Sequence, residues 1–225
     1  MSNLIRQHRQ RVLAAKQGAE GEHFDHKAAN QYELMLMLQA GHRRELKKVQ
    51  SIERKAEVKA KYLPEYQAYI DGVITGNSGR QDDVLMTVLL WQIDAGNFAE
   101  ALRLAAYAIG HDLQAPDRFE RKTATLIAEE IAEVAMKRAG TVEQVPAGLL
   151  LDTYELTQDQ DMFDQVRAKL HKAIGMAMEG EEQLTAAAEH YTRALELDER
   201  IGVKKLLEKV ERAIKNNPAQ AQPAG

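Results

Sequence analysis

Two helix-length segments separated by a two-residue turn constrain the fold of this chain most strongly. Residues 84–95 and 98–111 carry apolar residues at helical spacing, and only a Gly-Asn dipeptide lies between them. A connection this short joins helices that run antiparallel and pack against each other. Residues 162–178 and 184–198 repeat the arrangement across the sequence EGEEQ. The sequence therefore predicts helical hairpins.

These hairpins resemble tetratricopeptide repeats, in which small residues lie where two helices approach closely. The small residues at such positions in this chain are Ala101, Ala108, Gly175, Ala187 and Ala194. Tyr191 and Leu195 lie where large packing residues are expected. No segment has a convincing strand pattern. We expect an all-α fold in which residues 63–216 form a tetratricopeptide-like domain.

Residues 1–62 are expected to form a separate basic helical region. Residues 3–17 can form a short helix, and helical periodicity then runs from about Ala28 to Tyr62 as one long helix. Pro64 marks the boundary after it, and residues 217–225 are expected to be a disordered tail. The second half of the long helix has an apolar stripe that suits a partner helix in this chain or in another subunit, formed by Leu46, Val49, Ile52 and Ala56.

The net charge of -4 is the sum of a positively charged N-terminal part and a negatively charged remainder. Residues 1–61 hold 13 Lys/Arg and 7 Asp/Glu, a balance of +6, whereas residues 62–225 hold 17 and 27, a balance of -10. A basic part of this density suggests contact with a polyanion, because phosphate contacts need only positive charge. The competing interpretation is a solvated charged helix face. The predicted DNA-binding residues are Arg6, Arg9, Arg11, Lys16, Arg43, Arg44, Lys47, Lys48, Arg54 and Lys55.

Several classes of site are excluded by what the sequence lacks. The chain has no cysteine, which excludes disulfide frameworks and thiol nucleophiles and fits a cytoplasmic setting. The sequence contains no window of about 18 apolar residues, so it predicts no membrane span. It also contains no glycine-rich Walker loop, so ATP hydrolysis by this chain is not expected. His23, Asp25 and His26 are of metal-ligand type, but nearby glycines disfavour the helix that would align them, so we predict no metal site.

Two adjacent carboxylates, Asp82 and Asp83, directly precede the first hairpin. Such a pair can hold Mg²⁺ for phosphodiester cleavage, which makes them the candidate catalytic residues. However, two-metal sites gather further acidic groups, and adjacent residues on a helix point about 100° apart. The alternative is that Asp82 caps the helix and Asp83 lies in its first turn, near the positive end of the dipole. We expect no cofactor, and Mg²⁺ only if the chain is itself a nuclease.

The stretch QDDVLMTVLLWQIDAGNFAEALRLAAYAI resembles the central signature of the small terminase subunit of peduovirus-like tailed phages, which is also labelled the terminase endonuclease subunit. The segments ELTQDQDMFDQVRAKLHKAIGMAM and HYTRALELDERIGVKKLLEKVERAIK support the resemblance, which runs from about residue 28 to residue 216. Its signature positions in this chain are Asp82, Asp83, Trp91, Asp94 and Gly96.

The resemblance implies a subunit that binds the cohesive-end (cos) region of concatemeric phage DNA. It also implies assembly with the large ATPase subunit, for DNA cutting and packaging in the host cytoplasm. Small terminase subunits generally bind DNA through an N-terminal helical part and form rings, so we expect a homo-oligomer. Two alternatives stay open: a metal-dependent endonuclease that itself cleaves cos DNA, and a helical-repeat adaptor that binds only protein. The residues contain no complete nuclease motif, so enzymatic activity stays undecided.

Overall fold

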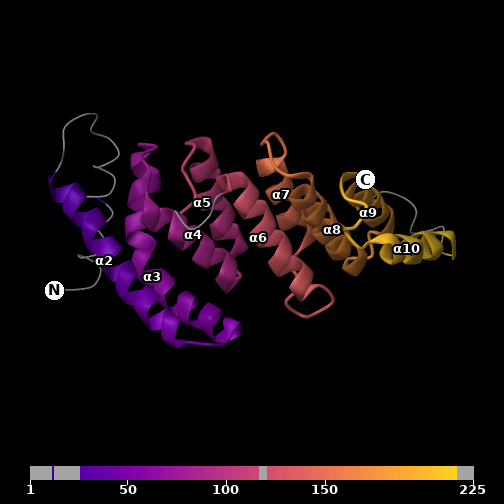
Figure 1. Cartoon of the computed structure of the whole chain (residues 1–225), viewed down its shortest axis with the longest axis horizontal. Helices are drawn as coiled ribbons and strands as arrows, with labels where there is room; N and C mark the ends of the chain where they lie inside the picture. Colours follow the sequence, from indigo (N-terminus) through magenta and orange to yellow (C-terminus); the bar gives the residue numbers. More distant parts are fainter. Residues whose placement is uncertain (1–11, 13–25, 117–120, 217–225) are drawn as a thin grey trace. The chain divides into compact units, whose positions relative to one another are not determined.

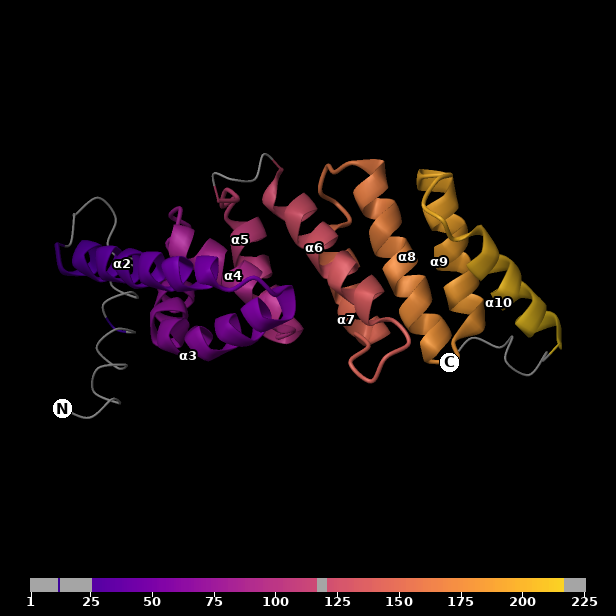
Figure 2. The same ribbon diagram turned by 60° about the horizontal axis from the view of Figure 1, so that its bottom comes forward.

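The computed structural model describes residue 12 and residues 26–116 and 121–216, and within these ranges every regular element is a helix (Figures 1 and 2). The all-α prediction is therefore confirmed. None of the described helices is both long and apolar enough to cross a membrane. The helices are α2 (His26–Lys48), α3 (Ile52–Gly76), α4 (Asp83–Ala95), α5 (Phe98–Gly110), α6 (Thr123–Arg138), α7 (Ala147–Thr157), α8 (Asp164–Gly180), α9 (Leu184–Leu197) and α10 (Lys204–Asn216).

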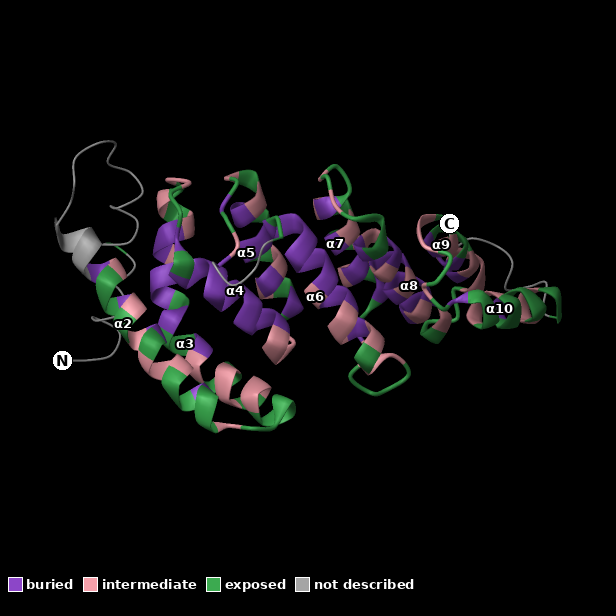
Figure 3. Ribbon diagram, viewed as in Figure 1, coloured by how far each residue is buried: buried purple, intermediate pink, exposed green. Residues whose placement is uncertain are grey.

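The chain divides into two compact units, Met1–Thr123 and Ala124–Gly225. In the first unit, α4 is the central helix, and α2, α3 and α5 pack around it. Every residue from Val84 to Ile93 is buried, as Figure 3 shows by colour. A helix that is apolar all round can be stable in water only when neighbours cover every face. The long apolar run therefore explains why α4 lies at the centre.

The long helix expected from Ala28 to Tyr62 is in fact two helices. α2 ends at Lys48, and the side chain of Ser51 caps α3 by accepting a 3.3 Å hydrogen bond from the backbone N–H of Arg54. The predicted apolar stripe is divided by this break: Leu46 is buried, whereas Ile52 is 81% exposed. The expected single stripe for a partner helix is therefore wrong.

The helix boundary expected at Pro64 is also wrong, because α3 continues through this proline to Gly76. A proline inside a helix costs about 3 kcal/mol. Tyr66, Tyr69 and Ile70 follow it and are almost completely buried, and burying one side chain of this size gains roughly 1.5–3 kcal/mol. Packing of α3 against α4 thus outweighs the missing hydrogen bond. The domain boundary expected between residues 62 and 63 falls inside this continuous helix.

In the second unit, α7 packs on α8, α8 on α9, and α9 on α10. Lys169 on α8 also binds α6, because its Nζ lies 2.6 Å from Oε1 of Glu129 and 3.1 Å from Oε1 of Glu133. α8 and α9 approach closely at Gly175, where an added Cβ would lie 2.6 Å from the ring of Tyr191. Only glycine fits here without moving the tyrosine. The short N-terminal helix expected at residues 3–17 and the expected tail, residues 217–225, lie outside the described residues.

Candidate nucleic-acid interface

The described basic residues of the N-terminal part gather where α2 ends and α3 begins, which we call the α2–α3 corner. Arg44, Lys47 and Lys48 are exposed near the end of α2, where the negative end of the helix dipole favours cations. Arg54 is exposed and Lys55 is half-buried in the first turn of α3. Figure 3 shows this corner largely in the colours of exposed and intermediate residues. Arg6, Arg9, Arg11 and Lys16 lie outside the described residues.

Two cations of the α2–α3 corner pair with acidic neighbours on their own helix. Lys48 Nζ lies 2.8 Å from Oε1 of Glu45, and Arg54 Nη1 lies 3.0 Å from Oε2 of Glu57. Exposed pairs of this kind contribute only about 0–1 kcal/mol. A phosphate can therefore replace either carboxylate at low cost. Within the described part of the chain, Arg44 has no acidic partner.

Arg43 faces inward, unlike its neighbour Arg44. Its Nη2 donates a 2.6 Å hydrogen bond to Oγ1 of Thr87, which is fully buried in α4. Its Nε is buried and meets no acceptor among the described residues. Arg43 therefore fastens α2 to α4, and the structure separates it from the exposed cations with which the sequence grouped it.

An aromatic cluster lies behind the α2–α3 corner and joins three helices. The ring of His42 on α2 stacks on Tyr62 of α3, with centroids 3.7 Å apart and planes 1° from parallel. His42 Nδ1 is also 2.8 Å from the hydroxyl of Tyr66, and Trp91 of α4 meets Tyr66 edge-on at 5.9 Å. Burial lowers the pKa of His42, although Glu65 partly opposes this change. The cluster packs α2 and α3 against α4, which gives Trp91 a structural role.

Asp82 is buried and both of its carboxylate oxygens are engaged. Oδ1 accepts a 2.8 Å hydrogen bond from the backbone N–H of Leu85, and Oδ2 accepts a 2.5 Å hydrogen bond from the hydroxyl of Tyr69. Burial raises the pKa of Asp82, against the effect of these hydrogen bonds. These contacts match the predicted alternative, in which Asp82 caps α4.

Asp83 lies in a different environment from Asp82. It is exposed in the first turn of α4, where its Oδ1 accepts a 2.9 Å hydrogen bond from Nε2 of Gln81. Among the described residues, the structure brings together no group of three or more His, Asp or Glu side chains that can hold a metal ion. The two adjacent carboxylates therefore do not converge on one point with a third acidic ligand.

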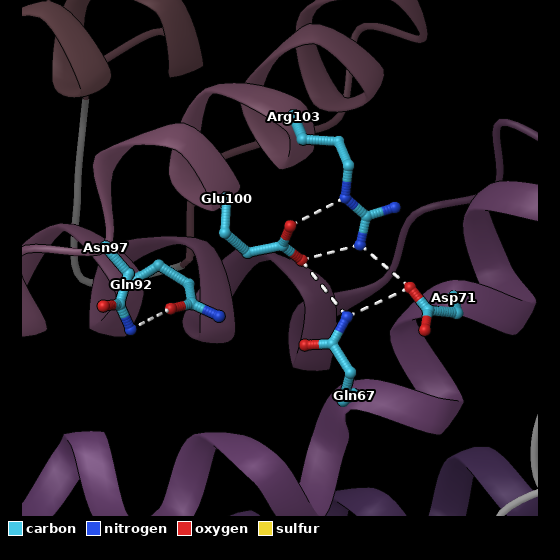
Figure 4. A network of polar contacts seen from close by, with 6 residues as sticks. All are labelled: Gln67, Asp71, Gln92, Asn97, Glu100 and Arg103. Atoms are coloured by element: carbon cyan, nitrogen blue, oxygen red, sulfur yellow. Dashed lines mark hydrogen bonds and ion pairs between the residues drawn. The ribbon is translucent and has the colours of Figure 1, made fainter. Parts of the chain in front are cut away.

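A polar network that was not anticipated from the sequence connects α3 with α5 (Figure 4). Arg103 on α5 binds Glu100 through two hydrogen bonds of 2.8 and 2.6 Å, and it also lies 3.0 Å from Oδ1 of Asp71 on α3. Gln67 donates to both Asp71 and Glu100. Burial raises the pKa of Glu100, but the hydrogen bonds and the positive charge of Arg103 oppose this effect, and the net result is a lowered pKa. The Glu-x-x-Arg spacing on α5 signals the local pair, whereas the contact with α3 depends on the fold.

Comparison with known proteins gives an independent line of evidence. A family model described as "Phage small terminase subunit" matches residues 35–165, which include the α2–α3 corner and both aspartates. A protein of Escherichia phage P2 named "Terminase, endonuclease subunit" is 40% identical over 223 residues, which cover 99% of this chain and 90% of that protein. No solved structure matches the chain.

Proposed function

The chain belongs to the phage small terminase subunit family, and we propose that its α2–α3 corner binds the cohesive-end (cos) region of double-stranded phage DNA. The protein is a small subunit of a DNA-packaging terminase, and DNA binding is a step that such a subunit needs. The observation that carries the proposal is the group of exposed cations on two helix ends that only three residues connect. Residues 43–61 hold 8 Lys/Arg and 3 Asp/Glu, a local balance of +5.

The exposed positive charge of the α2–α3 corner suits contact with the phosphate backbone. Lys and Arg neutralise phosphates without special geometry, and each contact releases counterions, so affinity falls steeply as salt rises. Such contacts position a protein on the duplex but carry no sequence information directly. Recognition of the cos sequence therefore requires other contacts, and the basic residues before residue 26 are candidates for them.

The test is a salt titration of binding to a cos duplex. Wild-type protein is compared with a variant in which Arg44, Lys47, Lys48 and Arg54 are replaced by Ala, while Arg43 is kept because it packs against α4. We expect affinity to fall at least tenfold at fixed salt. The slope of log affinity against log salt should become shallower by about 0.9 for each phosphate that the variant no longer neutralises. Replacing two exposed cations of the second unit, Lys137 and Arg193, by Ala is the matched control. Unchanged affinity of the four-residue variant would refute the assignment.

We also propose that the helical hairpins are tetratricopeptide-like units that dock the large ATPase subunit in the host cytoplasm. The acidic balance of residues after 62, and the close approach of α8 and α9 at Gly175, support this proposal.

We further propose that the protein self-associates through α2. Leu34 and Met37 on α2 are 50% and 70% exposed and lie three residues apart, so they present an apolar surface to a second copy. Mass measurement in solution, before and after Met37→Glu, tests whether this surface supports a homo-oligomer or ring.

A metal-dependent endonuclease that cleaves cos DNA itself is the alternative, and the name of the phage P2 relative favours it. The direct assay is incubation of purified protein with Mg²⁺ or Mn²⁺ and a cos-containing plasmid. Cleavage that survives both Asp82→Asn and Asp83→Ala would remove these residues from the mechanism.

A third function, an adaptor that binds only protein, is favoured if the whole chain retains no DNA even at low salt.

A further inference from the structure

The last described helix, α10, is basic, whereas the rest of the second unit is acidic. Residues 124–198 hold 6 Lys/Arg and 15 Asp/Glu, a balance of -9. Residues 199–216 hold 6 Lys/Arg and 3 Asp/Glu, a balance of +3. The overall acidity of the chain after residue 62 conceals this basic segment, which is separated in sequence from the α2–α3 corner by about 140 residues.

The positive charge of α10 lies on one exposed face. Val210 is buried, and α10 packs on α9, as Figures 1 and 2 also show. The opposite side is exposed (Figure 3). We call this side the α10 basic face, and its exposed cations are Lys204, Lys205, Arg212 and Lys215. Lys204 and Lys215 are eleven residues apart, which corresponds to about 16 Å along a helix. Glu208 and Glu211 are exposed on the same side and reduce the net charge of the face.

Two side-chain contacts connect α8 with α10 and with the loop that precedes it. Lys209 Nζ lies 2.5 Å from Oε1 of Glu179, whose Oε2 accepts a 2.8 Å hydrogen bond from Tyr191. Lys172 Nζ donates a 2.9 Å hydrogen bond to the carbonyl of Ile201, in the loop that leads into α10. Lys209 is therefore used to anchor the helix. The four cations of the α10 basic face make no ion pair with the described residues.

Local stability accounts for Lys215, which lies in the last turn of α10, but it does not explain the two lysines at the start of the helix. Lys204 and Lys205 are the first two residues of α10, and no acidic residue lies in its first turn. The positive end of a helix dipole disfavours cations by about 0.3–1 kcal/mol each at exposed positions. A sequence selected for helix stability alone would have Asp or Glu at these positions. The observed lysines therefore point to an external anionic partner.

We propose that the α10 basic face is a second contact surface for the phosphate backbone of DNA, in addition to the α2–α3 corner. The inference rests on the proposed DNA-binding function and adds a second surface to it, in the other unit of the chain. A row of cations about 16 Å long can face several phosphates of one duplex, because a duplex carries a charge every ~1.7 Å of its axis. Lysine-dominated contacts read no bases, so this surface strengthens binding equally on cos and unrelated sequences.

The test measures binding of full-length protein to two fluorescent duplexes of about 30 base pairs, one containing cos and one of unrelated sequence, between about 50 and 200 mM salt. In the main variant, Lys204, Lys205, Arg212 and Lys215 become Gln. We expect its affinity to fall about tenfold for both duplexes, with a salt slope shallower by roughly 2–4. The matched variant, Glu208→Gln with Glu211→Gln, alters the same helix in the opposite sense and should bind both duplexes more tightly. Thermal melts check that both variants fold.

The outcomes distinguish this inference from the proposed function. If wild-type protein binds DNA and the four-Gln variant binds it equally well, the α10 basic face is not a DNA contact, while the α2–α3 corner keeps its assignment. If wild-type protein binds neither duplex, the proposed function itself fails, and this inference fails with it. If the variant keeps its DNA affinity but no longer self-associates by mass measurement, the face binds an acidic protein surface and the inference is overturned.

Discussion

The hydroxyl of Tyr69 on α3 donates a 2.5 Å hydrogen bond to Asp82, the residue that caps α4. This bond joins two helices that are consecutive in sequence and fixes the start of the central helix of the first unit. It also uses one of the two carboxylate oxygens of Asp82, while the N–H of Leu85 uses the other. Asp82, the first candidate catalytic residue, therefore has a structural role as the cap of α4.

The Asp82→Ala variant should be destabilised by about 2–4 kcal/mol, because it removes a helix cap and leaves the buried Tyr69 hydroxyl unsatisfied. Asp82→Asn keeps a capping side chain and should be destabilised less. Urea unfolding followed by circular dichroism gives both values. Tyr69→Phe is the control, since it breaks the same bond but keeps the carboxylate. Equal stability of Asp82→Ala and wild type would contradict the assigned cap.

Gly175→Ala should destabilise the second unit by about 1–3 kcal/mol through overpacking. The new Cβ would lie 2.6 Å from the buried ring of Tyr191, which cannot move without breaking its hydrogen bond to Glu179. Gly148→Ala is the matched control, because nothing lies within 4 Å of the added Cβ on α7. It should gain up to about 0.5 kcal/mol, less than the benefit of Ala over Gly in the middle of a helix, because Gly148 is the second residue of α7. Thermal melts of the two variants should shift in opposite directions.

The hairpin at Gly96 and Asn97 was predictable because its determinants are local. Two apolar-periodic segments flank a Gly-Asn turn, and Gly96 has the positive φ of 81° that the end of α4 requires. The break between α2 and α3 was not predictable in the same way, since the residues Val49, Gln50 and Ser51 include neither Gly nor Pro. A single serine cap, combined with burial of Tyr66 after Pro64, decides where these helices begin and end.

The candidate interface shows the same limit of sequence reasoning. Arg43 and Arg44 are adjacent and chemically identical, so charge counting assigns both to DNA. The hydroxyl of Thr87, 44 residues away, binds Arg43 and leaves Arg44 exposed. The α10 basic face was missed for a different reason. Summing charge over residues 62–225 averaged a short basic helix with a long acidic segment.

Acidification should weaken the second unit between about pH 6.5 and pH 4. His171 Nδ1 lies 2.9 Å from His190 Nδ1 at the contact of α8 with α9. Burial, followed by the charges of His190, Arg193 and Arg167, lowers the pKa of His171 to about 4, and burial also lowers that of His190. Both folded-state values lie below the ordinary value of about 6.5, so the unfolded chain binds protons first. Stability is therefore complete above about pH 6.5 and declines as pH falls.

Urea midpoints measured at intervals from about pH 7.5 down to about pH 5.0 follow this decline. Replacing both histidines by Leu should flatten the pH dependence without abolishing it, because the pKa of the half-buried His42 in the first unit is also lowered. The comparison stops at about pH 5.0, since carboxylates begin to titrate below that value. A double variant with the same slope as wild type would show that the pair does not titrate as assigned.

Phe163→Ser should raise the stability of the second unit by about 1 kcal/mol. Phe163 stands at the N-cap of α8, makes no side-chain capping hydrogen bond, and is 64% exposed. Serine at this position can accept a hydrogen bond from one of the first N–H groups of the helix, which phenylalanine cannot do, and little apolar burial is given up. Val142→Ser is the control, because this residue is fully exposed in a loop and should change stability by less than about 0.5 kcal/mol. If Phe163→Ser instead destabilises the protein as measured by urea unfolding, the phenylalanine ring must make a stabilising contact, and the cap explanation is wrong.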